Sequence, residues 1–265
     1  MRRTLVTFHA HPDDEAIATG GVMAQAASDG HRVVLVVATR GEVGEAADGV
    51  LRPGEELWER RVEETHRAAE ILGVSRVEFL GCRDSGMMGA PTNDEPGSFW
   101  SAEVGAAAAR LAALLRQERA DVLTVYDERG NYGHPDHIQV HRVGVRAGEL
   151  ARTPQVFEAT MNRDHIRRLA ASMLVGLPEG TEAPDPADLD DLGVAEHVLT
   201  TAVDVREFID LKRAAMAAHA SQIAENSFFL SMPPEAFREG FGYEWFIRRG
   251  APPGISESSL FEHLA

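Results

Sequence analysis

The stretch from Arg32 to Thr39, RVVLVVAT, constrains the fold more than any other part of the sequence. It is a nearly continuous run of β-branched and other apolar residues, which is typical of a strand that is buried on both faces. Such strands occur mostly in parallel sheets, because helices then cover both faces of the sheet. The stretch therefore predicts an α/β protein built around a parallel sheet.

Segments with strand-like and helix-like patterns alternate along the first half of the chain. The expected strands are Thr4–Phe8, Arg32–Thr39, Arg76–Leu80 and Asp121–Tyr126, and the expected helices are Glu15–Gly30, Glu56–Gly73 and Ala102–Arg119. Connections that contain whole helices imply right-handed crossovers between parallel strands. We therefore expect a Rossmann-like, doubly wound and mostly parallel sheet with helices on both faces.

The second half of the chain is less regular. Further strands are expected at Pro154–Thr160, His197–Val205 and Tyr243–Arg249, with a helix at Arg206–Glu225 and an acidic, proline-bearing surface loop at Glu179–His197. We expect residues 1–160 to form the Rossmann-like core. Residues 161–265 are expected to be a smaller C-terminal elaboration that packs on the core, within one structural domain overall, and helps to shape a substrate cleft.

Charge and cysteine content narrow the classes of partner. The 265 residues include 42 acids and 26 bases, a formal charge of −16 that repels nucleic acid and anionic membranes. The single cysteine, Cys82, excludes an internal disulfide framework and a zinc site of paired thiolates, and it suits a reducing cytoplasm. We therefore expect a cytoplasmic protein with small-molecule ligands, bound neither to nucleic acid nor to a membrane.

Polar side chains gather where four expected strands end. The segments that follow these strands are His11–Glu15, Gly41–Glu45, Gly81–Gly89 and Asp127–His137. In open parallel sheets, ligands bind in the crevice beyond the carboxyl ends of the strands. The sequence therefore predicts one functional site at this edge of the sheet.

Two His-Pro-Asp motifs indicate a metal site. His11 and Asp14 are three residues apart after the first strand, and His134 and His137 follow the fourth. Either motif alone could simply cap a helix, but two motifs at separate strand ends favour a shared ion. Two histidines and one carboxylate form the ligand set of a catalytic zinc, and non-haem iron(II) enzymes use the same set. Zn²⁺ is the expected metal, with Fe²⁺ or another divalent ion as the alternative.

Acidic and basic groups beside this site suggest hydrolysis of an acyl bond. Asp13 precedes the expected ligand Asp14 and is placed to act as general base. His134 could be held protonated by Asp136, so that it stabilises an oxyanion or protonates a leaving amine.

The motifs AHPDDE (Ala10 to Glu15) and GHPDH (Gly133 to His137) together resemble the signature pair of the PIG-L/LmbE-like zinc-dependent N-deacetylases. The resemblance implies that His11, Asp14 and His137 bind zinc. It also implies that Asp13 is the general base and that His134, with Asp136, is the electrostatic or acid partner.

Further positions resemble the mycothiol branch of these enzymes. They are GEVGE (Gly41 to Glu45), Arg61, RDSGM (Arg83 to Met87), Tyr132 and the segment Lys212–Ile223. By this resemblance Tyr132 assists the oxyanion, His219 and Gln222 lie near the site, and the substrate contacts are Glu45, Arg61, Asp84 and Met87. One departure is Ala16–Ala18, since mycothiol enzymes tend to carry polar residues after this motif.

The expected activity is metal-dependent hydrolysis of the acetamide of an N-acetylglucosaminyl or similar sugar-like metabolite, which releases acetate and a free amine. The alternatives are cleavage of mycothiol S-conjugates, deacetylation of a glycosylated natural-product intermediate, iron(II)-dependent oxidation, and a non-catalytic protein that binds a sugar or a metal. The expected partner is a small N-acylated, sugar-like substrate, and a homo-oligomer is compatible with the sequence.

Overall fold

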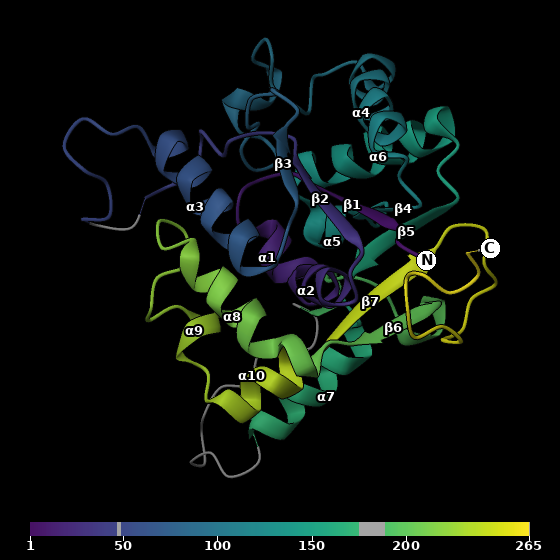
Figure 1. Cartoon of the computed structure of the whole chain (residues 1–265). Helices are drawn as coiled ribbons and strands as arrows, with labels where there is room; N and C mark the ends of the chain where they lie inside the picture. The colour runs from purple at the N-terminus through teal and green to yellow at the C-terminus, as the bar shows by residue number, and fades with distance from the viewer. Residues whose placement is uncertain (47–48, 175–188, 265) are drawn as a thin grey trace.

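A single seven-stranded sheet organises the molecule (Figure 1). The computed structural model describes residues 1–46, 49–174 and 189–264. The strands are β1 (Thr4–His9), β2 (Arg32–Val37), β3 (Arg76–Phe79), β4 (Val122–Tyr126), β5 (Gln155–Thr160), β6 (Thr201–Asp204) and β7 (Tyr243–Arg248). The helices are α1 (Asp14–Ala18), α2 (Gly20–Ser28), α3 (Leu57–Ile71), α4 (Val104–Glu118), α5 (Gly130–Gly133), α6 (Pro135–Ala151), α7 (Arg163–Leu174), α8 (Ile209–Ala218), α9 (Phe228–Ser231) and α10 (Pro234–Phe241).

The strand order is β3-β2-β1-β4-β5-β7-β6, and the first five strands in this order are parallel. This is the doubly wound arrangement that the sequence predicts, and the order reverses between β1 and β4. In register, Leu5 of β1 lies between Val33 of β2 and Val122 of β4. The carboxyl ends of β1 and β4 are therefore neighbours, which brings the two His-Pro-Asp motifs together.

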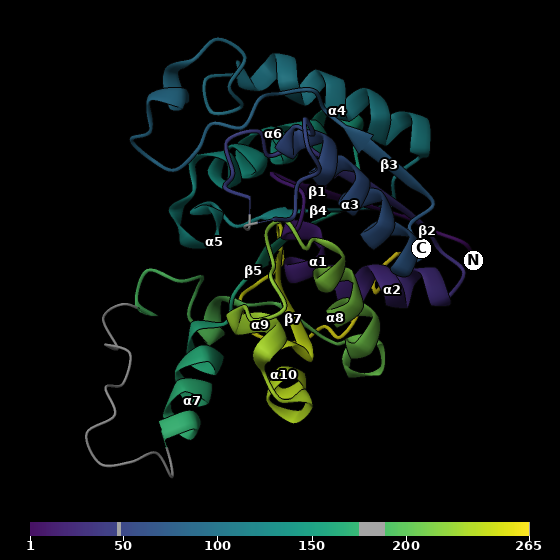
Figure 2. The same ribbon diagram turned by 90° about the vertical axis from the view of Figure 1, so that its left-hand side faces the viewer.

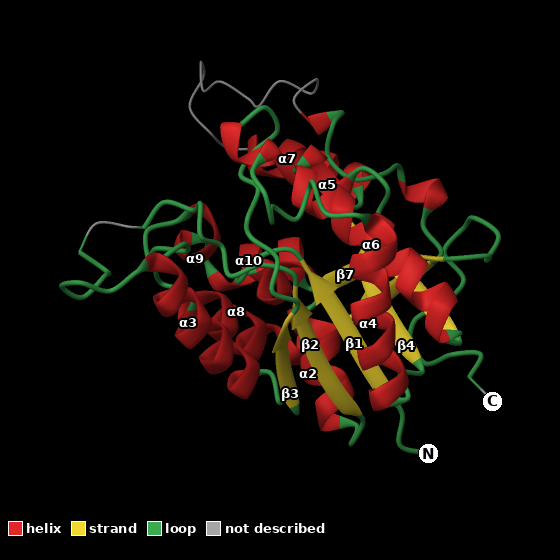
Figure 3. Cartoon of the chain, turned by 90° about the horizontal axis from the view of Figure 1, so that it is seen from above, coloured by secondary structure: helices red, strands yellow, loops and turns green. Residues whose placement is uncertain are grey.

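Helices cover both faces of the sheet (Figures 1 and 3). Helices α4 and α6 pack against each other on one face, while α2, α3 and α8 lie on the other. Figure 2 shows α7, α9 and α10 grouped beyond the antiparallel end of the sheet. Among the described residues, no helix is both long and apolar enough to cross a membrane.

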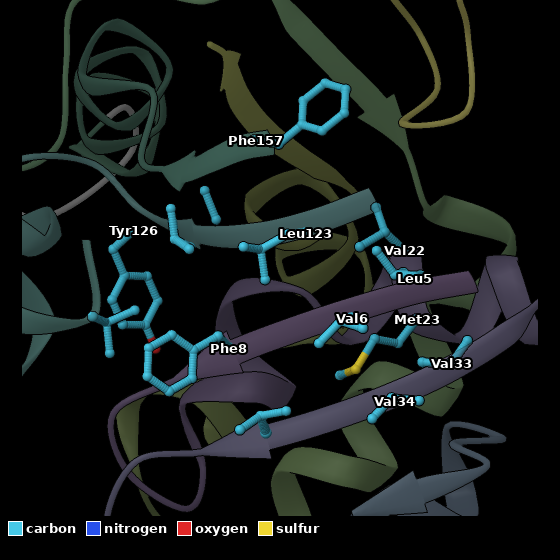
Figure 4. Packing of buried hydrophobic residues seen from close by; sticks show 14 of the residues in the cluster. Leu5, Val6, Phe8, Val22, Met23, Val33, Val34, Leu123, Tyr126 and Phe157 are labelled. Atoms are coloured by element: carbon cyan, nitrogen blue, oxygen red, sulfur yellow. The ribbon is translucent and has the colours of Figure 1, made fainter. Parts of the chain in front are cut away.

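The apolar core forms around the central strands. Figure 4 shows side chains of β1, β2 and β4 packed with Val22 and Met23 of α2. All residues of β1 and β4, and all but the first of β2, are buried. The continuous apolar runs of these strands are needed because both faces of the sheet are covered.

Residues after 160 contribute strands to the same sheet. Strand β7 pairs antiparallel with β5, and β6 pairs antiparallel with β7. Helix α8 packs on α1, α2 and α3 of the first half of the chain. The C-terminal segment is thus interleaved with the Rossmann-like core.

Two of the expected helices are interrupted in the structure. The helix expected at Glu15–Gly30 is broken at Thr19, whose hydroxyl lies 2.9 Å from a ring nitrogen of the buried His9. A Cβ atom on Gly21 would lie 2.4 Å from Val205, so this glycine permits the close approach of α2 to the C-terminal segment. The helix expected at Arg206–Glu225 consists of a 3-10 turn and α8, and it ends at Ala218. Most of the acidic loop expected at Glu179–His197 falls in 175–188, outside the described residues.

A buried ion pair ties β7 to the first half of the chain. Lys212 Nζ of α8 donates to Glu244 Oε1 at 2.6 Å, and both side chains are 2 % exposed. The same carboxylate accepts the backbone N–H groups of Gly21 and Val22, at 2.7 and 2.8 Å, at the start of α2. The first-turn N–H groups of a helix have no hydrogen-bond partner within the helix. The carboxylate of Glu244 accepts hydrogen bonds from two such groups of α2 and also neutralises the ammonium of Lys212.

We predict that Glu244→Ala destabilises the protein by about 3–5 kcal/mol, because it leaves the Lys212 ammonium buried and unpaired. Urea unfolding followed by circular dichroism measures the change. Asp204→Ala, which breaks the exposed pair with Arg206, is the matched control and should change stability very little. Equal losses in the two variants would contradict a structural role for the buried pair.

Candidate metal centre and active site

The first motif forms a sharp turn between β1 and α1. Asp13 has a φ of 100° and a ψ of −35°, a left-handed conformation that residues other than glycine rarely adopt. The backbone N–H of His11 donates to Asp14 Oδ2 at 2.9 Å. The turn therefore places the side chains of His11, Asp13 and Asp14 at the carboxyl edge of the sheet.

His11 uses its two ring nitrogens differently. Its Nε2 atom lies 3.1 Å from Asp136 Oδ2 and 3.4 Å from Asp84 Oδ1. Its Nδ1 atom lies 3.4 Å from Asp14 Oδ2. When Nε2 donates to Asp136, the nitrogen left for a metal ion is Nδ1, which faces Asp14. A carboxylate on the other ring nitrogen is typical of a metal-ligating histidine.

The second motif comes from the connection between β4 and α6. His137 stacks on Tyr126, with ring centroids 4.5 Å apart, and its Nε2 atom lies 3.3 Å from Asp14 Oδ2. Gly130 permits this approach, because a Cβ atom there would lie 2.6 Å from the Cβ of His137. The carboxylate of Asp14 thus lies near one nitrogen of each histidine.

The geometry of these three side chains fits a metal ion. Two ligands of a tetrahedral zinc, each about 2.0–2.1 Å from the ion, lie about 3.3–3.4 Å apart. The separations of Asp14 Oδ2 from His11 Nδ1 and His137 Nε2 are 3.4 and 3.3 Å. The other ring nitrogen of His137, Nδ1, is buried without a hydrogen-bond partner in the described part of the chain. Burial opposes ionisation of Asp14, but the two histidines outweigh it and hold the pKa of this carboxyl well below its ordinary value.

Two groups of side chains, both of which include His11, offer atoms that could bind a metal ion. His11, His134 and His137 offer nitrogens that lie within 4.8 Å of one another, and so do atoms of His11, Asp84 and Asp136. The second group is already used by the protein, because Asp136 Oδ2 accepts the Ser85 N–H and Asp84 Oδ1 accepts the Gly86 N–H, both at 2.9 Å. The side of His11 that faces Asp14 and His137 is therefore the better metal site.

His134 departs from its expected pairing with Asp136. Its Nδ1 atom accepts the backbone N–H of Asp136 at 3.1 Å, and the Asp136 side chain points to His11 instead. Burial lowers the pKa of His134 to about 4, and the nearby His11 and His137 act in the same direction. Both observations contradict the expectation that the Asp136 carboxylate holds His134 protonated. They favour a neutral ring, in which Nδ1 accepts and Nε2 carries the proton.

Arg61 of α3 holds the turn that carries Asp13. Its guanidinium donates to the carbonyls of Pro12 at 2.6 Å and Gly41 at 3.1 Å, and it lies 3.5 Å from Asp13 Oδ1. Burial raises the pKa of Asp13 to about 6, although Arg61 opposes the rise. A Cβ atom on Gly41 would lie 2.1 Å from Arg61, so a glycine is needed there.

Glu15 and His219 support the same turn from behind. One oxygen of Glu15 accepts the Asp13 N–H at 3.0 Å, and the other lies 2.6 Å from His219 Nε2. Both side chains are fully buried, and His219 follows the last turn of α8. Burial opposes protonation of His219, but Glu15 outweighs this effect and raises its pKa. Nothing in the spacing of the sequence indicated this contact across 204 positions.

Most of the other residues expected at the site line the same cavity, but Glu45 does not. The cavity lined by His11, Asp14 and His137 is also lined by Arg61, Asp84, Met87, Tyr132, His134 and Gln222. The Tyr132 hydroxyl lies 3.4 Å from His137 Nε2. Glu45 is exposed and does not line this cavity, but its carbonyl accepts a hydrogen bond from Gln222 at 3.0 Å.

Comparison with known proteins shows what the chain is similar to. The family model described as "PIG-L: GlcNAc-PI de-N-acetylase" matches residues 6–148. A 1D-myo-inositol 2-acetamido-2-deoxy-alpha-D-glucopyranoside deacetylase of Acidothermus cellulolyticus is 40% identical over 260 residues, covering 93% of this chain and 89% of the relative. The protein of the same name from Thermobifida fusca is 41% identical over 286 residues, covering 98% and 99%.

Solved structures show the same fold at lower identity. An N,N'-diacetylchitobiose deacetylase from Pyrococcus horikoshii has a TM-score of 0.58 at 24% identity, covering 99% of this chain and 86% of that one. A deacetylase of the teicoplanin biosynthesis pathway has a TM-score of 0.61 at 18% identity, covering 94% and 100%. The family match and the two relatives, which are 40% and 41% identical over nearly the whole chain, show that the chain belongs to the GlcNAc-PI de-N-acetylase (PIG-L) family of N-deacetylases.

Proposed function

We propose that this protein is a zinc-dependent N-deacetylase that hydrolyses the acetamide of an N-acetylglucosaminyl compound and releases acetate and a free amine. The observation that carries the proposal is the convergence of His11, Asp14 and His137 beside Asp13 at one buried edge of the sheet. The names of the full-length relatives, which are deacetylases of a GlcNAc-inositol compound, support the substrate class.

His11 Nδ1, Asp14 and His137 Nε2 would hold the ion. Two imidazoles and one carboxylate suit Zn²⁺, and hydrolytic relatives favour it over redox-active iron. When bound there, Zn²⁺ supplies Lewis-acid polarisation of the amide carbonyl and brings the pKa of water towards about 7.

Asp13 acts as the general base. Its carboxylate faces the cavity next to Asp14, and the turn that carries it is anchored by Arg61 and Glu15. Asp13 takes a proton from water as the water oxygen attacks the carbonyl carbon, and it then passes the proton to the leaving nitrogen as the C–N bond breaks. This step gives acetic acid and the neutral amine, and transfer of the acid's proton to the amine then yields acetate and the protonated amine at neutral pH.

His134 and Tyr132 stabilise the oxygen on which negative charge develops. Because Nδ1 of His134 accepts a backbone N–H, its Nε2–H is a donor, and His134 lines the cavity together with Tyr132. A neutral imidazole that is fixed before reaction can donate to the oxyanion without reorganising. Asp136 does not contact the substrate in this mechanism. It acts indirectly, because its hydrogen bond orients the ring of His11.

The substrate sugar would occupy the end of the cavity lined by Arg61, Asp84 and Met87, with Glu45 at the margin. Asp84 is almost fully buried, whereas Met87 is exposed. A free thiol at Cys82 is consistent with the reducing environment of the cytoplasm, where we place the protein.

We predict that exhaustive chelation abolishes amine release from N-acetylglucosaminyl substrates and that Zn²⁺ restores it. His137→Ala should lose the metal and at least 10²-fold in kcat, because one of three protein ligands is removed. Metal content by mass spectrometry and a fluorogenic amine assay give the two readouts. The control is Arg146→Ala, at an exposed residue of the same helix that pairs with Glu149. Activity that survives complete removal of metal would refute the zinc mechanism.

We predict that His219 acts as a positioning residue for Asp13 through Glu15. His219→Ala should lower kcat by about 10–100-fold at unchanged metal content and similar KM, because the support of the Asp13 backbone is lost. Asp13→Asn should lower kcat by about 10²–10⁴-fold, again with metal retained. Partial recovery is expected for His219→Gln, whose amide can donate to Glu15. His66→Ala, an exposed histidine on α3, is the control. A fall in Tm with unchanged kcat in His219→Ala would assign that residue a structural role only.

A further inference from the structure

The cavity at the metal centre extends well beyond the reacting groups. Its volume is about 1050 Å³, at the upper limit of the range usual for small-molecule sites. One end holds the metal ligands, Asp13, Arg61 and Asp84. The other end is walled by β7 and by α7, α9 and α10, the three helices that group together beyond the antiparallel end of the sheet (Figure 2).

The far end is lined mainly by apolar side chains, and we call it the apolar arm. Its residues are Met161, Ile166, Phe228, Phe229, Met232, Phe241 and Trp245. Ile17 and Ala18 of α1 also line the cavity, three and four residues after the proposed ligand Asp14. These two residues belong to the segment in which the chain departs from the polar pattern of the mycothiol enzymes.

Four polar residues that line the cavity near the apolar arm, Lys212, Glu244, Asn162 and His165, already have partners within the protein. Lys212 and Glu244 bond each other at 2.6 Å, and Glu244 also accepts two N–H groups of α2. Asn162 donates to Glu196 at 2.9 Å and accepts the N–H of His165 at 3.0 Å. A hydroxyl-rich group placed there would lose water without gaining equivalent hydrogen bonds, whereas an apolar group would gain from burial.

The geometry points to a substrate that is an amphiphile: an N-acylated amino sugar that carries an alkyl or aryl group, with this group bound in the apolar arm. This inference rests on the proposed deacetylase function and narrows its substrate class. The arm is continuous with the reacting centre, so the group that fills it is joined to the sugar. The alkyl or aryl group could be attached through the glycosidic oxygen or through the acyl carbon. In both cases an apolar group joined to the amino sugar would fill the apolar arm.

Steady-state amine release from three synthetic substrates tests the inference. They are methyl N-acetyl-β-D-glucosaminide, its octyl glycoside, and methyl N-octanoyl-β-D-glucosaminide. Each buried methylene improves binding by about fourfold, so we expect kcat/KM at least tenfold higher for one octyl compound than for the methyl glycoside. Preference for the octyl glycoside assigns the arm to the aglycone, and preference for the octanoyl amide assigns it to the acyl chain.

Variants separate the arm from the reaction. Phe228→Asp changes a side chain that is 66 % exposed and lines the arm, so the fold should tolerate it. In this variant the ratio of octyl to methyl kcat/KM should fall towards one. Leu211→Asp, at an exposed leucine on α8 outside the cavity, is the matched control and should keep the wild-type ratio and the wild-type rate on the methyl glycoside.

The outcomes distinguish the two proposals. Hydrolysis of the methyl glycoside with no octyl preference, or an octyl preference that Phe228→Asp leaves intact, would overturn the apolar arm and leave the deacetylase function standing. Failure of the zinc-loaded protein to release amine from all three compounds would instead contradict the proposed function.

Discussion

The hydrogen bond between His11 Nε2 and Asp136 Oδ2, 3.1 Å long, is the interaction on which the candidate site depends. It joins the end of β1 to the start of α6, which follows β4. Because Nε2 is engaged by Asp136, Nδ1 is the ring nitrogen of His11 that faces Asp14, and Asp14 in turn lies beside His137. The parallel pairing of β1 with β4 makes this contact possible, so the sheet topology and the chemistry of the imidazole are linked.

The second constraint is the left-handed backbone at Asp13. Such a conformation persists only where neighbouring groups hold it, and here they come from distant parts of the chain. Glu15 bonds the Asp13 amide, His219 pairs with Glu15, and Arg61 bonds the carbonyl of Pro12. Residues after 160 therefore support the turn at Asp13 as well as the sheet, since His219 follows α8.

Much of the fold was predictable because its signals are local. Continuous apolar runs identified β1, β2 and β4, and two short motifs identified the side chains that meet at the edge of the sheet. The break at Thr19 was not predictable, because it depends on the buried His9 and on Val205 in the C-terminal segment. The partner of His134 was wrongly expected to be the Asp136 carboxylate, since spacing does not tell a backbone N–H from a side chain. The apolar arm was not predictable from the sequence. Its residues come from α7, α9, α10, β7 and the connections beside them, and they share no motif.

Crystallography with anomalous scattering at the zinc absorption edge tests the central claim most directly. We expect one peak within bonding distance of His11 Nδ1, the Asp14 carboxylate and His137 Nε2, with Asp136 still hydrogen bonded to His11 Nε2. A peak on the opposite side of the ring, bonded to His11 Nε2 together with Asp84 and Asp136, would contradict the account. In that case the carboxylates that we assign to orienting His11 would themselves be the ligands.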